Sequence, residues 1–210
     1  KRYQTPVSDK YLILFKNGDT KSWFGDLDEP KAWEKLTDRY PAICKYLFQF
    51  EKKAKARCDK GHYWWELRAC DYYNEFEEEK IMLPDISLKC EALFDTYNGF
   101  YCVNTAYIIP TSNKSDLGIL NCKLVMFFYS KLTQTIRGGY YRFIRQYLEQ
   151  IPMIHSKEIE SKVDQIITFK KINPAAETSD LESQIDQLVY QLYDLTEEEI
   201  AIIENSTNKC

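Results

Sequence analysis

The residues best suited to chemistry in this sequence are hydrogen-bond donors rather than catalysts. Arginine and lysine can donate to the edge of guanine, asparagine can pair with adenine, and tyrosine can bind phosphate. Arg137 is the strongest candidate, because the Gly138-Gly139 pair follows it in a polar loop. For any one arginine, an ion pair within the fold or simple solvation is an equally good explanation, and Asn104 also fits a turn. The full candidate set is Arg68, Lys80, Asn104, Arg137, Tyr140 and Arg142.

No group of residues predicts catalysis. Glu78-x-Lys80, with Asp71 upstream, matches half of a nuclease pattern, but so short a pattern is common by chance. The sequence has no phosphate-binding loop, no GxSxG and no HExxH. Its two histidines, His62 and His155, are too scattered for acid–base work. We therefore expect no catalytic residue in this chain.

Cysteine usage indicates a reducing compartment. The seven cysteines are irregularly spaced and none forms a CxxC pair, so we expect no metal site and mostly buried, reduced thiols in a cytoplasmic protein. No apolar run approaches the ~18 residues of a membrane span, and no signal peptide is visible. The first residue is Lys1 rather than methionine, which suggests a fragment of a longer polypeptide.

The charge is unevenly distributed along the chain. The net charge is −4. Residues 1–150 hold 23 Lys and Arg against 20 Asp and Glu, whereas residues 151–210 hold 5 against 12. Affinity for nucleic acid depends on local charge at the phosphates rather than on the total. We therefore expect the acidic C-terminal part to lie away from any nucleic acid.

The first third of the chain predicts one strand and then helices. Lys10–Lys16 has the composition of a strand, and the turn Asn17-Gly18-Asp19 follows it. Residues 20–30 are expected to form a loop, with a helix from about Lys31. A stronger helix is predicted from Pro41 to about Arg57, because proline suits the first position of a helix.

The middle of the chain mixes strands and helices. Lys80–Pro84 is an apolar strand, and a second strand ends at Pro110. Ser115 is expected to cap a helix over 116–132. A polar loop over 133–139 and an extended segment over 140–152 follow. Of the adjacent Trp64 and Trp65, we expect one in the core and the other supporting a contact surface.

The C-terminal part is predicted to be helical. One apolar stripe contains Ile159, Val163, Ile166 and Ile167, and the sequence Asn173-Pro174 breaks the pattern. Ser179 with Glu182, and Thr196 with Glu199, have the spacing of capping boxes. The second stripe must be buried on its own domain, on the rest of the parent, or on a second copy. It consists of Leu181, Ile185, Leu188, Val189 and Leu192.

Several short phrases, in this order, resemble the TaqI-like C-terminal specificity domain, over roughly residues 9 to 204. Cys122 stands where that family usually has serine. The phrases are Trp65-Glu66-Leu67-Arg68, Lys80-Ile81 with Pro84-Asp85-Ile86-Ser87, Asn104-Thr105-Ala106-Tyr107, Gly118 to Leu124, Arg137 to Arg142, Gln150-Ile151-Pro152 and Leu195 to Ile200.

The resemblance implies the target-recognition domain of an adenine-specific DNA methyltransferase or of a type IIG restriction-modification enzyme. The implied partners are double-stranded DNA and an upstream methyltransferase domain of the same polypeptide. The implied cofactor is S-adenosylmethionine in that upstream domain, and none in this fragment. The implied fragment is non-catalytic, whether or not its parent carries a fused endonuclease.

We expect an α+β fold with a mixed or antiparallel sheet region and packed helices, followed by a helical C-terminal tail. The expected division is a recognition domain over 1–152 and the tail over 153–210. The alternative function is a protein-interaction module in which the tail forms a homodimer. Loss of a dimer on Leu188→Asp, without DNA binding, would favour that alternative.

Overall fold

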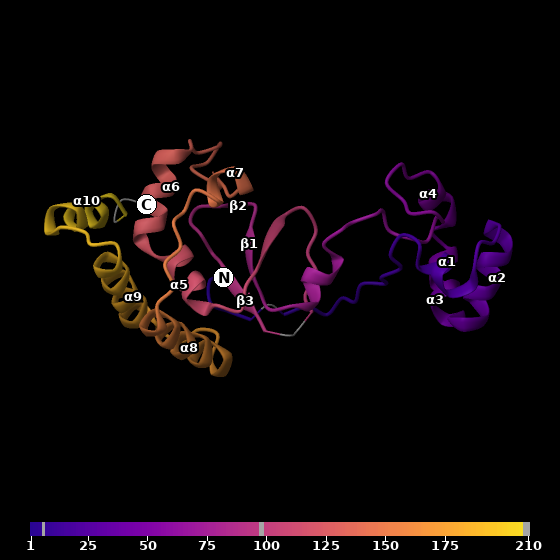
Figure 1. Ribbon diagram of the computed structural model, residues 1–210, viewed down its shortest axis with the longest axis horizontal. Coiled ribbons are helices and arrows are strands. Elements are labelled where there is room, and N and C mark those ends of the chain that lie inside the picture. The colour runs from indigo at the N-terminus through magenta and orange to yellow at the C-terminus, as the bar shows by residue number, and fades with distance from the viewer. Residues whose placement is uncertain (6, 97–98, 208–210) are drawn as a thin grey trace. The chain divides into compact units, whose positions relative to one another are not determined.

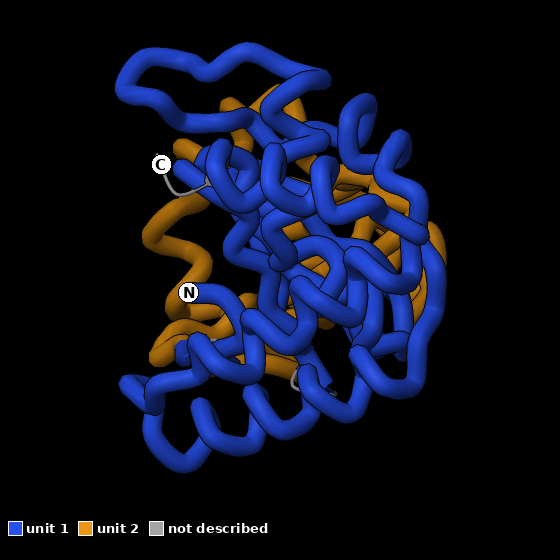
Figure 2. Tube along the Cα trace, turned by 90° about the vertical axis from the view of Figure 1, so that its left-hand side faces the viewer, with its two compact units in different colours: residues 1–7, 74–210 blue, residues 8–73 orange. Residues whose placement is uncertain are grey.

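The computed structural model describes residues 1–5, 7–96 and 99–207, and the chain divides into two compact units (Figures 1 and 2). Unit 1 combines residues 1–7 with residues 74–210. Unit 2 is residues 8–73, inserted between the two parts of unit 1. The fold is mixed α+β with helices at the C-terminal end, as the sequence predicts.

Unit 2 is helical. Asp28 begins α2 by accepting a hydrogen bond from the Lys31 amide, and Pro41 occupies the first position of α3. The predicted helix over 41–57 is present but interrupted at Gln49 and Phe50. The helices are α1 (Asp19–Phe24), α2 (Glu29–Arg39), α3 (Pro41–Phe48) and α4 (Glu51–Lys55).

Two expectations for residues 10–30 of unit 2 are wrong. Lys10–Lys16 forms no strand, because residues 8–73, all of them described, supply no partner strand. In this segment Tyr11 is almost fully exposed and Phe15 is buried. Residues 20–30 are not a loop throughout, since α1 occupies the first part. The turn before α1 is present, with Gly18 at a φ of 87°.

The core of unit 2 is aromatic. Trp64 and Trp65 are both buried, so neither supports a contact surface, contrary to expectation. The ring of Trp65 stacks on Tyr63 at a centroid distance of 4.7 Å, and its Nε1 donates to Thr20 Oγ1 at 2.9 Å. Trp33 packs against both tryptophans. The indole N–H thus finds a polar partner inside the core, as buried tryptophan requires.

Glu66 is a fully buried carboxylate that organises the loops of unit 2. Its Oε1 accepts from the Thr20 amide at 3.0 Å, and its Oε2 accepts from the amides of Gly18 at 3.2 Å and Tyr63 at 3.3 Å. Gly61 lies so close that a Cβ there would meet Glu66 Cβ at 2.6 Å. One side chain therefore ties the start of α1 to the tryptophan-containing segment.

Unit 1 contains a three-stranded antiparallel sheet in the order β3-β1-β4. β1 (Lys80–Pro84) is central, and pairs with β3 (Leu93–Asp95) and β4 (Ala106–Pro110). The predictions of a strand from Lys80 to Pro84 and of one ending at Pro110 are confirmed. Ile81 and Leu83 of β1 are almost completely buried, so this strand forms part of the core.

Helices cover this sheet and extend to the C-terminal end (Figure 1). α5 packs against β3, α8 and α9, and α10 packs against α6. Gly118 permits the close approach of α5, since a Cβ there would lie 2.6 Å from Ile159 Cγ2. The helices are α5 (Lys114–Asn121), α6 (Lys123–Leu132), α7 (Arg145–Leu148), α8 (Lys157–Ile172), α9 (Ser179–Leu192) and α10 (Glu197–Thr207).

The predicted helix over 116–132 is wrong as a single element. Asn113, rather than Ser115, caps α5, and the helix stops at Asn121. Cys122 has extended backbone and caps α6, with its Sγ accepting from the Val125 amide at 3.4 Å. The extended segment expected over 140–152 is likewise interrupted by α7.

The described cysteines are free thiols. Three of these six are buried, and the seventh cysteine, Cys210, lies outside the described residues. Burial raises the pKa of both Cys90 and Cys122 to about 12, so neither forms a reactive thiolate at neutral pH.

The apolar stripes of the C-terminal helices face the core of unit 1. Ile159, Val163 and Ile166 of α8 are completely buried there. Ile185 and Val189 of α9 are buried in the same core, and the three leucines of the α9 stripe pack against it. The stripe therefore packs on its own unit, which is the first of the three alternatives.

The two expected capping boxes have different outcomes. Thr196 and Glu199 form theirs, with the Thr196 amide donating to Glu199 Oε2 at 2.8 Å and the Glu199 amide donating to Thr196 Oγ1 at 3.3 Å. At α9 the expectation is wrong by one residue. Thr178, not Ser179, precedes the helix, and its Oγ1 donates to Glu182 Oε1 at 2.7 Å.

The first residues of the chain belong to unit 1. Tyr3 is buried in the unit 1 core, and its amide donates to the Ala92 carbonyl at 3.1 Å. Arg2 forms an ion pair with Glu182 of α9. The chain is thus anchored in unit 1 before it enters unit 2.

Candidate nucleic-acid interface

A second, two-stranded sheet in unit 1 carries the candidate surface. β2 (Ile86–Ser87) pairs antiparallel with β5 (Tyr141–Arg142), and the Phe143 amide extends the pairing by donating to the Asp85 carbonyl at 2.7 Å. Phe143 is buried and stacks on Tyr129 of α6 at a centroid distance of 4.7 Å. The pair of strands is therefore held from within by α6, while Ile86 and Arg142 are exposed.

A tight turn presents Arg137 just before β5. The Ile136 amide donates to the Tyr140 carbonyl at 2.7 Å, which closes a loop around Arg137. Gly138 and Gly139 have φ values of 90° and 81°, a backbone region that glycine adopts without strain. The side chains of Arg137 and Tyr140 are both exposed. The loop predicted from the glycine pair is thus present, with its arginine facing solvent.

Arg142 is exposed but held in place. Its Nε donates to Asp85 Oδ1 at 3.3 Å, and the side chains are 60% and 12% exposed, respectively. Its carbonyl accepts from the buried Tyr129 hydroxyl at 2.6 Å. This arginine is therefore fixed at both its backbone and its guanidinium.

Asn104 lies in the turn before β4, next to a residue that is hydrogen-bonded to Asp85. The Asp85 amide donates to the carbonyl of Thr105, the residue next to Asn104, at 2.9 Å. Asn104 is exposed, as is its neighbour Val103. Four of the six candidate residues, Asn104, Arg137, Tyr140 and Arg142, thus lie on or beside the β2–β5 pair.

Lys80 does not belong to this surface. It is completely buried at the start of β1, the end remote from Asp85, and its Nζ lies 2.6 Å from Asp95 Oδ2. The same ammonium donates to the carbonyls of Phe76 at 2.6 Å and Glu78 at 3.3 Å. The expectation that Lys80 faces DNA does not fit this placement, because its donors serve the interior of the fold.

Arg68 lies in unit 2, where its side chain is exposed and its carbonyl accepts from the Tyr73 hydroxyl at 3.1 Å. Its contact with DNA stays a prediction.

Sequence reasoning missed Asp85 as a member of the candidate site. The one available signal was an acidic residue directly after the proline that ends a strand.

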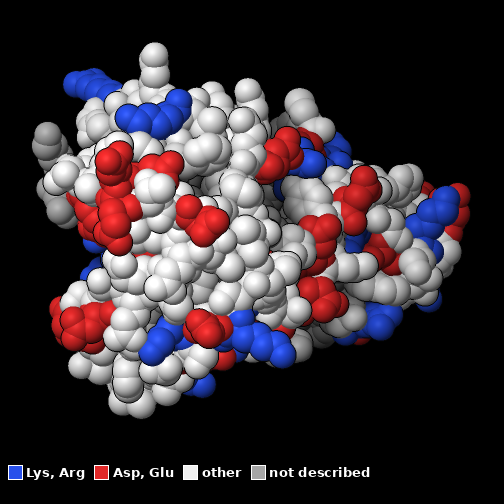
Figure 3. All heavy atoms as spheres, turned by 60° about the vertical axis from the view of Figure 1, so that its left-hand side comes forward, with Lys and Arg blue, Asp and Glu red and all other residues white. Residues whose placement is uncertain are grey.

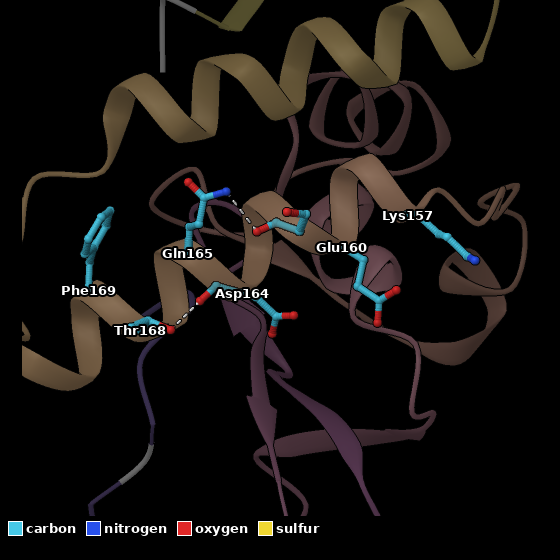
Figure 4. A pocket seen from close by; sticks show the side chains of 7 residues that line it. Lys157, Glu160, Asp164, Gln165, Thr168 and Phe169 are labelled. Atoms are coloured by element: carbon cyan, nitrogen blue, oxygen red, sulfur yellow. Dashed lines mark hydrogen bonds between the residues drawn. The ribbon is translucent and has the colours of Figure 1, made fainter.

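Two hollows lie elsewhere on unit 1. One lies on α8, where two of the polar side chains bond to their own helix (Figure 4): Thr168 Oγ1 donates to the Asp164 carbonyl and Gln165 Nε2 to the Ser161 carbonyl. A larger one adjoins Arg2, Lys123 and Glu182, whose charges are already paired within the unit. Neither adds residues to the candidate surface.

Acidic side chains are prominent on the side that bears the C-terminal helices (Figure 3). This agrees with the excess of acidic residues after residue 150. Among the described residues, no group of three or more histidine, cysteine, aspartate or glutamate side chains could hold a metal ion. None of the described helices is long and apolar enough to cross a membrane.

The chain belongs to the TaqI-like C-terminal specificity domain family, whose model matches residues 1–153. The resemblance seen in the sequence is therefore confirmed, although the match ends at residue 153, before the phrase from Leu195 to Ile200.

Two curated relatives are methyltransferases by name. The chain is 30% identical over 172 residues to the type II methyltransferase M.XhoI of Xanthomonas vasicola, covering 78% of this chain and 30% of the relative. It is 24% identical over 179 residues to the type II methyltransferase M.BstVI of Geobacillus stearothermophilus, covering 80% of this chain and 30% of that relative. The chain spans less than a third of the length of both relatives.

Proposed function

We propose that this chain recognises a short sequence in double-stranded DNA on behalf of a type II restriction-modification methyltransferase. The observation that carries the proposal is membership of a specificity-domain family, together with similarity to two methyltransferases of which this chain matches 30% of the length. The exposed β2–β5 surface supplies donors of the kind that bind bases and phosphates. Recognition without catalysis also agrees with the absence of a catalytic motif in the sequence.

The proposal extends to the rest of the polypeptide. An upstream domain binds S-adenosylmethionine and methylates adenine, with or without a fused endonuclease, and the protein works in the cytoplasm, where the DNA is. We keep the division of labour between a recognition part over 1–152 and a helical tail over 153–210 as part of this proposal. Arg68 stays in the proposed contact set, and Lys80 leaves it.

The alternative function, a dimerisation module, has less support than the sequence suggested. It rested on the acidic tail and on the α9 stripe, and that stripe packs on the core of unit 1.

Selection from a library of random duplexes tests the proposed function. The chain is mixed with labelled 30-base-pair duplexes at low salt, and bound duplexes are recovered, amplified and sequenced over successive rounds. We expect convergence on one short sequence, and an affinity that falls steeply as salt rises, because phosphate contacts release counterions. Failure to bind duplex DNA, or binding without enrichment, would overturn the proposal.

Arg137→Ala is expected to weaken binding to the selected duplex by about five- to a hundredfold, the range of one lost base or phosphate contact. Fluorescence anisotropy with labelled duplex measures the change. The exposed position of Arg137 predicts an unchanged urea unfolding midpoint. Lys171→Ala, also exposed but on α8 in the acidic part of the chain, is the matched control and should leave the affinity as it is. Equal affinity of both variants and the parent would remove Arg137 from the interface.

A further inference from the structure

We infer that Arg142 reads a single guanine and that Asp85 is the residue that positions it. This inference rests on the proposed function and assigns one base to one side chain. Nε of Arg142 is bonded to Asp85 Oδ1. Among the described residues, no partner is recorded for the two terminal nitrogens of Arg142, whose side chain is 60% exposed. The free end of the guanidinium therefore faces solvent in a defined orientation.

The position of Asp85 is set by the backbone on both sides. Its amide donates to the carbonyl of Thr105, just before β4, and its carbonyl accepts from the amide of Phe143, just after β5. Its side chain is only 12% exposed. The backbone of Asp85 is thus bonded on both sides, which places its side chain beside Arg142. An arginine bonded to it loses less rotamer freedom on binding than a solvated one does.

The chemistry of the free end selects guanine. Two parallel N–H groups match two adjacent acceptors, and in the major groove guanine presents these at O6 and N7. Adenine presents N7 beside an amino donor, and cytosine presents an amino donor, so both place an N–H against an N–H. Arg142 is therefore suited to discriminate between bases.

Arg137 differs in this respect. It lies in a glycine turn, and no carboxylate is recorded beside its guanidinium in the part of the chain that the structure describes. A cation of this kind suits phosphate, which accepts from many directions. The two arginines are consequently expected to act differently: Arg137 on affinity for all duplexes, Arg142 on the choice of sequence.

The test compares base preferences rather than affinities alone. After the parent chain has selected its sequence, anisotropy is measured with duplexes in which each base pair is replaced in turn. In the parent we expect one G·C pair to be preferred over its replacements by about five- to 150-fold in affinity. Arg142→Met should lose this preference and keep the preferences at every other position. Asp85→Ala should weaken the preference at that same pair, and Asp85→Asn, whose amide oxygen can still accept from Nε, should restore part of it.

The outcomes separate this inference from the proposed function. If the parent chain selects no sequence, the proposed function is wrong. If the parent selects a sequence but Arg142→Met lowers the affinity equally for all duplexes, Arg142 contacts phosphate. That result overturns the assignment of Arg142 to guanine and leaves the proposed function standing. An Arg142→Met variant identical to the parent shows an ordinary surface ion pair and also overturns that assignment. Because Arg142 is exposed, this variant should fold even if Asp85→Ala does not.

Discussion

Replacing Lys80 with methionine is expected to lower the free energy of unfolding by about 3–5 kcal/mol, the usual cost of removing one partner from a buried ion pair. Lys80 and Asp95 both have fully buried side chains, with 2.6 Å between Nζ and Oδ2. Methionine fills much the same space but takes the cation away from the Asp95 carboxylate and one donor away from each of two carbonyls. Urea unfolding followed by circular dichroism measures the loss.

The control for this prediction is the double variant Lys80→Met with Asp95→Leu, which removes both charges. It should be closer in stability to the parent than Lys80→Met is, because no uncompensated charge remains. A loss below about 1 kcal/mol for Lys80→Met would mean that the pair does not stabilise unit 1 as argued. In either case DNA contacts at β2–β5 should be intact in the folded fraction.

The second large effect is expected at Glu66 in unit 2. Glu66→Ala should cost about 3 kcal/mol or more, because three backbone N–H groups lose their acceptor in a buried site and each unsatisfied donor costs about 1–3 kcal/mol. All four tryptophans, Trp23, Trp33, Trp64 and Trp65, lie in unit 2, so their fluorescence during urea unfolding reports on this unit.

Glu66→Gln is the matched variant, because it keeps the volume and one acceptor oxygen. Its loss of stability should fall between those of the parent and Glu66→Ala. If Glu66→Ala unfolds within about 1 kcal/mol of the parent in the tryptophan signal, the three amides must find other partners, and the organising role of Glu66 would be wrong.

Local sequence patterns were sufficient to predict an element where the residues that begin and end it lie within or beside the segment itself. The strands from Lys80 to Pro84 and up to Pro110 are bracketed by residues that mark strand ends. The stripe of α8 and the Thr196–Glu199 box are equally local. Lys10–Lys16 has the composition of a strand and is none, since a strand needs a partner, and no window of sequence shows whether one is present.

The candidate site shows the same limit. The loop that presents Arg137 could be predicted, because two adjacent glycines permit the positive φ values of its turn. Lys80 could not be separated from the exposed cations, since nothing near it in sequence reveals that Asp95, on the neighbouring strand, takes its charge. Asp85 was missed for the converse reason: its importance comes from Arg142, 57 residues further along the chain.

The break at Cys122 arises from a similar non-local cause. The apolar spacing from Leu117 to Phe128 continues without interruption, so periodicity alone predicts one helix. The extended backbone of Cys122 instead turns the chain between α5 and α6, and the Lys123 amide donates to Asp186 of α9 at 2.9 Å. A partner 63 residues away thus helps to set the end of one helix and the start of the next.

The insertion of unit 2 between residues 7 and 74 has a consequence for how such genes recombine. Tyr3 lies in the unit 1 core, so the codons for residues 1–7 belong with those for residue 74 onwards. A single crossover within unit 2 would pair an N-terminal segment from one parent with the core of another. Exchange of unit 2 as an intact cassette requires two crossovers, one near each of its ends.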